Sequence, residues 1–284
     1  MTTLFAILAT LRRATGSVTG AVGFAIFVLV ILAALFAPVI ATHDPDALDV
    51  MNRFAPPSAA HWLGTDHLGR DLFSRLIHGA TIAMSVALSA IALALAAGTV
   101  LGILAAYLSD RGERVILILF DVIAAFPSLV LALAIVAVFG PSTGVVVAIV
   151  ALTMTPHFGR VARAQVLTLK NAPFLEAERI LGASGTRIVF VHLLPNIMGP
   201  LVVLASMDIP VVITIEAGLS FLGLGVRPPL ASWGTLIQDG YQFLSDSWIP
   251  VVVSSLALAL ATLGFTLFGE ALRDAVDPRI GRER

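Results

Sequence analysis

Six long apolar stretches restrict the fold of this chain more than any other feature of its sequence. They lie at about residues 21–41, 81–108, 115–139, 143–161, 197–217 and 247–268. A helix needs about 20 mostly apolar residues to cross a bilayer. The composition agrees with membrane insertion, since 58% of the residues are hydrophobic and 12% are charged, whereas about a quarter of the residues in soluble domains are charged. We therefore predict an all-α, polytopic membrane protein with six transmembrane helices.

The lysine and arginine residues orient these helices, because cytoplasmic loops carry an excess of both residue types. With the N-terminus inside, 13 of the 17 basic residues fall in inner segments. The outer segments carry the other four, which are Arg53, Arg70, Arg75 and Arg227. We therefore predict that both termini are cytoplasmic, that residues 42–80 lie outside and that residues 159–195 lie inside.

The pattern of spans divides the chain into four parts. These are a cytoplasmic segment at 1–20, the first span with an outer loop at 21–80, a membrane core at 81–270 and a cytoplasmic tail at 271–284. The fourth span looks short, because Pro156 and His157 fall near its predicted end. The N-terminal segment has two interpretations, a short amphipathic helix on the inner membrane face or a frayed tail.

The inner loop contains a polar stretch that favours a short helix at about residues 174–182. Pro173 suits the first turn, where its missing N–H costs nothing, and Glu176 follows where a carboxylate favours the positive helix end. Gly182 and Gly185 can end the helix and turn the chain. We predict a helix across the membrane plane with one apolar side (Phe174, Leu175, Ile180, Leu181) and one charged side. An ordinary interfacial helix between spans is the alternative.

The sequence of this inner loop resembles a known motif. Glu176, Ala177 and Glu178, then Gly182, and Leu194-Pro195 further on, are similar to the EAA loop of ATP-binding-cassette import permeases. Three more segments resemble the dipeptide/oligopeptide/nickel permease family, namely HWLGTDHLGRDLFSRLIHG at 61–79, EAGLSFLGLGVRPPLASWG at 216–234 and LRDAVDPR at 272–279. The long outer loop and the single EAA loop point to the C-type subunit. Glu178 departs from the usual alanine at the third motif position.

The resemblance implies a type I importer permease fold in the bacterial inner membrane. It implies three kinds of protein partner besides the lipid bilayer: a homologous B-type permease, two ATPase subunits and an extracytoplasmic solute-binding protein. ATP and Mg would be bound by the ATPases, and this chain would bind no cofactor. The implied ATPase-docking residues are Phe174, Leu175, Glu176, Ala177, Glu178, Gly182, Ala183 and Ser184. The implied function is ATP-driven import of peptides or related small solutes, nickel complexes included.

Three acidic residues, Asp121, Asp208 and Glu216, fall within or at the ends of the predicted spans. Membrane-embedded carboxylates are costly, so each is a candidate for the translocation pathway. Structural roles are the alternative, above all for Glu216. A proton-coupled secondary transporter is the competing function, and it predicts inverted internal repeats, of which we see no convincing example. A membrane scaffold or sensor would explain the spans but not the matched loops.

Several functions have no support in the sequence. There is no cysteine, and the single lysine, Lys170, is not part of a phosphate-binding loop. No catalytic constellation stands out, so we do not expect an enzyme. The net charge of −1 gives no reason to expect a nucleic-acid partner. Imidazole binds nickel well, but the outer-loop histidines (His43, His61, His67 and His78) are irregularly spaced. We therefore predict no metal site.

Overall fold

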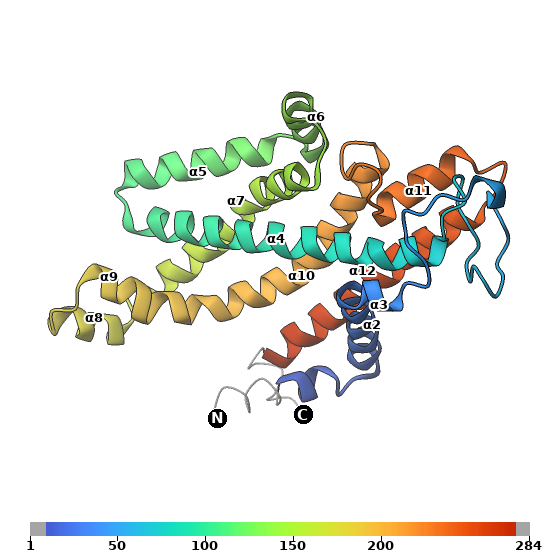
Figure 1. Cartoon of the computed structure of the whole chain (residues 1–284). Helices are drawn as coiled ribbons and strands as arrows, with labels where there is room; N and C mark the ends of the chain where they lie inside the picture. Colours follow the sequence, from blue (N-terminus) through green and yellow to red (C-terminus); the bar gives the residue numbers. More distant parts are fainter. Residues whose placement is uncertain (1–9, 277–284) are drawn as a thin grey trace. The chain divides into compact units, whose positions relative to one another are not determined.

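The computed structural model describes residues 10–276, and these residues form helices without any β-strand (Figure 1). The all-α prediction is confirmed. Five helices are long and apolar enough to cross a membrane, and a bent pair makes a sixth candidate. The elements are α2 (Val18–Leu35), α3 (Ala37–Ile40), a 3-10 turn (Val50–Asn52), α4 (Leu72–Tyr107), α5 (Asp110–Ala125), α6 (Ser128–Phe139), α7 (Thr143–Leu169), α8 (Pro173–Ile180), α9 (Gly185–Arg187), a π-helical stretch (Ile188–Leu193), α10 (Leu194–Phe221), α11 (Trp233–Gln242) and α12 (Ile249–Val276).

The predicted third span is not one continuous helix. The helices α5 and α6 meet at an angle of 89°. Phe126 between them adopts an extended conformation, as expected of a residue that precedes a proline. Pro127 therefore breaks the apolar run at 115–139, which the hydropathy pattern alone presents as uniform.

Two other spans are longer than predicted. The helix α7 has 27 residues and continues past Pro156. The hydroxyls of Thr153 and Thr155 donate to the carbonyls of Val150 and Ala151 just before this proline, whereas the carbonyl that loses its helical N–H partner at Pro156 is that of Leu152. The helix α4 has 36 residues, and its length of about 54 Å at 1.5 Å per residue exceeds a hydrocarbon core of about 30 Å. Its first turns therefore lie within residues 42–80, the segment between the first two predicted spans.

The described chain forms two compact units. One contains residues 10–88, 132–147 and 207–276, and the other contains residues 89–131 and 148–206. These units do not coincide with the four consecutive parts defined from the sequence, because α4, α7 and α10 each contribute residues to both units. Residues 10–14 are helical, while the rest of the proposed N-terminal helix, residues 1–9, lies outside the described residues. The C-terminal tail beyond Val276 also lies outside them.

In the first unit, α2 packs against α12 through small residues. A Cβ atom at Gly23 would lie 2.6 Å from the backbone nitrogen of Phe268, so only glycine allows this approach. The rings of Phe27 and Phe268 pack beside it with centroids 4.8 Å apart. Small residues that allow close helix contact are typical of membrane helix pairs.

In the second unit, the later part of α4 packs against α7 in the same way. Gly98 and Gly102 face Phe158 and Gly159 so closely that a Cβ atom at either glycine would clash. At the helix ends, Lys170 Nζ donates to the carbonyl of Ala106 at 2.8 Å. This packing fixes the C-terminal end of α7, from which the chain continues into α8.

Candidate functional site

The helix α8 forms as the sequence predicts. Pro173 occupies its first position and Glu176 its first turn. Gly182 follows the helix with φ +82°, and its N–H donates to the carbonyl of Arg179. The N–H of Ala183 donates to the carbonyl of Glu178. This pair of bonds is a Schellman motif, which ends a helix at a residue of positive φ.

Gly185 has a different structural role from the one predicted. It begins α9 instead of turning the chain, and Ser184 caps this helix by accepting a hydrogen bond from the N–H of Arg187 at 3.3 Å. Serine is a strong N-cap residue, because its hydroxyl satisfies one of the free N–H groups at a helix start. From Gly185 the chain stays helical to Phe221, through the π-helical stretch and α10.

The predicted apolar side of α8 is divided between the interior and the surface. Leu175 is fully buried. Phe174, Ile180 and Leu181 are 45%, 85% and 81% exposed, and Glu176 and Arg179 are exposed beside them. The charges argue against immersion in hydrocarbon. The helix therefore presents a mixed apolar and charged surface to the aqueous phase, and exposed apolar patches with polar rims mark interaction sites.

Glu178, which departs from the motif, turns back toward its own chain. Its carboxylate lies 3.5 Å from His192 Nε2, and both side chains are largely covered. Arg179 remains exposed, and its guanidinium donates to the carbonyl of Lys170 at 3.0 Å. Of the two motif carboxylates, Glu176 is thus the more exposed.

The three candidate pathway carboxylates lie in different surroundings. Asp121 on α5 is exposed and accepts a hydrogen bond from Arg160 on α7 at 2.7 Å, so its charge is balanced. Asp208 is half-buried on α10. Glu216 is fully buried, and its Oε1 accepts from the hydroxyl of Ser220 at 2.7 Å. The same hydroxyl accepts from the N–H of Val226 at 3.2 Å, so Glu216 helps to hold the chain that follows α10.

A buried charge network that the sequence did not predict lies around the start of α4. Arg70 Nε lies 2.7 Å from Asp66 Oδ2, and Arg75 Nε lies 3.4 Å from the same oxygen. All three side chains are buried, and Asp239 on α11 completes the network at 3.6 Å from Arg70. Burial raises the pKa of Asp239 and lowers the pKa of His67 beside it. The sequence did offer one signal for this network, the crowding of charged residues directly before the apolar run that begins near residue 81.

These features define a multi-pass membrane protein with a short, exposed, charged helix between two of its long apolar helices. Residues 98–282 match the binding-protein-dependent transport system inner membrane component family, and residues 3–57 match the N-terminal TM domain of oligopeptide transport permease C. The chain belongs to this family of inner-membrane transport components. It is a permease subunit of an ATP-binding-cassette importer and a non-catalytic one, as the sequence predicts.

Similar proteins support this assignment over most of the chain. The di/tripeptide transport system permease protein DppC of Pseudomonas aeruginosa is 41% identical over 92% of this chain and 88% of its own length. The glutathione transport system permease protein GsiD of Pectobacterium atrosepticum is 38% identical over 92% and 87%. The oligopeptide transport system permease protein OppC of Bacillus subtilis is 37% identical over 91% and 85%. No comparison supports the proton-coupled alternative.

A solved structure confirms the predicted fold. An inward-facing structure of the MetNI methionine ABC transporter contains a chain that aligns with a TM-score of 0.58 at 16% identity. The alignment covers 71% of this chain and 96% of that chain. At this identity the match concerns the fold alone, and it is that of a type I importer permease.

Proposed function

We propose that this chain is the C-type permease of an ATP-driven importer for peptides or related small solutes. The observation that carries the proposal is the identity of 37–41% to permeases named for di/tripeptide, glutathione and oligopeptide transport, over more than nine-tenths of the chain. The chain would form half of the membrane pathway beside a homologous B-type permease. Two ATPase subunits with bound ATP and Mg would lie on the cytoplasmic side, and a solute-binding protein outside.

The exposed surface of α8 is the proposed contact with one ATPase. Phe174, Ile180 and Leu181 would enter an apolar recess of that subunit, and Glu176 would lie at the rim of the contact. Leu175 is fully buried, so it holds α8 against its own permease. Interfaces commonly combine an apolar centre with a polar rim in this manner.

The chain that follows α8 is suited to transmit a displacement of this helix to the membrane-spanning part of the permease. Only residues 181–184 separate α8 from α9, and the chain is then helical from Gly185 to Phe221. When ATP closes the ATPase dimer, α8 would move with its subunit and displace this helical segment. Rigid-body rocking of the helices would then switch access from the inner to the outer side, where the binding protein releases its solute.

The solute class can be tested on the cognate binding protein. We expect dipeptides or longer peptides to bind the purified protein with Kd of about 1 μM or tighter, equivalent to about −8 kcal/mol, in calorimetric titrations. Glutathione and nickel salts serve as comparisons. Binding of nickel complexes with no response to any peptide would contradict the peptide assignment while leaving the permease assignment intact.

Single-cysteine labelling tests the proposed topology, and the absence of native cysteine removes the background. Ser58 and Asn171 are both exposed, one on each predicted side. We expect Ser58→Cys to react with an impermeant maleimide in intact cells, and Asn171→Cys to react only after the membrane is permeabilised. The reverse pattern would refute the proposed orientation of the termini.

A further inference from the structure

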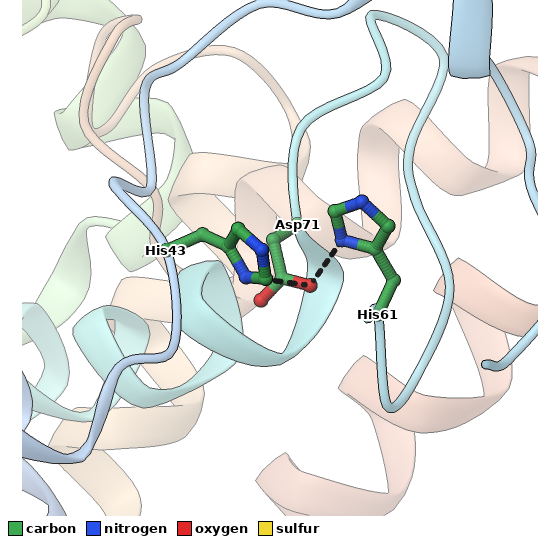
Figure 2. A group of neighbouring side chains, drawn as sticks. All are labelled: His43, His61 and Asp71. Carbon is green, nitrogen blue, oxygen red and sulfur yellow. Dashed lines mark hydrogen bonds and ion pairs between the residues drawn. The ribbon is translucent and has the colours of Figure 1, made fainter. Parts of the chain in front are cut away.

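Two imidazoles and one carboxylate converge in the outer segment, although they are far apart in the sequence (Figure 2). His43 follows α3, His61 lies in the loop after the 3-10 turn, and Asp71 directly precedes α4. His61 Nδ1 lies 2.9 Å from Asp71 Oδ1, and His43 Nδ1 lies 3.8 Å from the same oxygen. One ligand atom from each of the three residues falls within 4.8 Å of the other two.

The carboxylate of Asp71 is oriented by its surroundings. Its Oδ2 accepts from the backbone N–H of Ser74 at 2.8 Å and from the Ser74 hydroxyl at 2.7 Å. The hydroxyl of Thr42 approaches the same oxygen at 3.3 Å. These bonds leave Oδ1 directed at the two imidazoles, which lie on either side of it in Figure 2. Hydrogen bonds of this kind to the other oxygen are the usual means by which proteins orient a metal-ligating carboxylate.

We propose that His43, His61 and Asp71 bind one divalent transition-metal ion of the zinc type. Two imidazoles and a carboxylate form a ligand set that zinc accepts, with a fourth position left for water. Tetrahedral bonds of about 2.0–2.1 Å require ligand atoms about 3.3 Å apart, and the observed separations of 2.9 and 3.8 Å bracket this value. Two imidazoles disfavour the harder ions calcium and magnesium, which prefer oxygen ligands.

A shared proton explains only half of this arrangement. The hydrogen bond of His61 to Asp71 accounts for one imidazole. The ring of His43 instead stacks on that of His61, with centroids 4.6 Å apart, and its Nδ1 lies 3.0 Å from the Thr42 hydroxyl and 3.8 Å from Asp71 Oδ1. An ion between the three ligand atoms accounts for both rings. It would fasten the loop after α3 to the start of α4 and so stabilise the outer segment.

The irregular spacing of the histidines, which led to the prediction of no metal site, does not weigh against this proposal. The fold brings together residues 18 and 10 positions apart, because the chain after α3 returns to the start of α4. His67, by contrast, stacks on Phe243 with ring centroids 4.9 Å apart and takes no part in the cluster. It therefore offers a matched control histidine in the same segment.

The test uses the full-length permease in detergent, purified with a tag that contains no histidine and stripped with a chelator. Zinc sulfate is the probe, and the readouts are metal content per chain and a calorimetric titration. We expect one zinc ion per chain, and at least about hundredfold weaker binding in His43→Gln, which alters a half-exposed side chain and leaves the Asp71–Ser74 bonds in place. Ser74→Ala should weaken binding about 10–100-fold, because it removes the hydroxyl that helps to orient Asp71 and that accepts from the backbone N–H of His43, while all three proposed ligands remain.

His67→Gln should bind zinc like the unaltered protein. Equal zinc affinity in the unaltered protein, His43→Gln and Ser74→Ala would show adventitious binding and overturn the proposal. Less than one equivalent of zinc on the unaltered protein would overturn it as well. Since neither His43→Gln nor Ser74→Ala removes a large buried side chain, a thermal unfolding scan of each suffices to show that it is folded.

Discussion

Ile180→Asp and Gly182→Asp are expected to lower the yield of co-purified ATPase at least about tenfold and to stop solute uptake, while the permease still inserts. Burial of an isoleucine side chain contributes about 1.5–3 kcal/mol, and 1.4 kcal/mol is tenfold in affinity. Ile180 is 85% exposed, so its replacement leaves the permease interior unchanged. Gly182 has φ +82°, and a side chain there strains the turn that ends α8. Glu176→Lys should act in the same direction, because it reverses a charge at the edge of the surface.

Two matched variants separate docking from general damage. Gly185 also has open space around it but no positive φ, so Gly185→Ala should retain the ATPases. Met51 is 94% exposed in the outer segment, so Met51→Asp repeats the change from an apolar to a charged residue away from α8. Affinity purification through the permease, with quantification of the ATPase bands, gives the readout. Wild-type ATPase yield in both Ile180→Asp and Gly182→Asp would refute the docking role.

Uptake into proteoliposomes that hold the whole complex is expected to require ATP and to survive an uncoupler. The reason is that ATPase closure, not proton movement, would drive the switch of access. Solute binding protein is supplied on the outer side and ATP inside the vesicles. An imposed proton gradient without ATP should give no uptake above the background of empty vesicles. Uptake driven by that gradient alone would restore the secondary-transporter alternative.

The three candidate pathway carboxylates sharpen this experiment. Asp121→Asn removes an exposed ion pair with Arg160, and such pairs contribute about 0–1 kcal/mol. Glu216→Gln keeps an oxygen to accept from Ser220. We expect Asp121→Asn, Asp208→Asn and Glu216→Gln to lower the rate or the stability, with ATP dependence unchanged in each. Suppose instead that uptake by the unaltered complex responds to the proton gradient and that one variant loses this response. That result would assign the substituted carboxylate to proton coupling.

Local sequence signals were sufficient for the elements that depend on neighbouring residues. The apolar runs predicted the membrane helices, because the bilayer imposes one length and one polarity on every span. Pro173 and Gly182 predicted the start and the end of α8, since each acts through its own backbone. The motif around Glu176 led to the family, and the type I importer permease fold followed from the family.

Features that depend on distant residues needed the tertiary structure. The 89° bend at Pro127 has a local cause, but hydropathy averages over a window and did not reveal it. The length of α7 beyond Pro156 was missed for the same reason. The burial of Glu216 and the exposure of Ile180 arise from what packs against each helix. The network of Asp66, Arg70 and Arg75, and the meeting of His43 and His61 at Asp71, depend on loop paths. Sequence spacing does not encode those paths, because the contacts that set them join residues far apart in the chain.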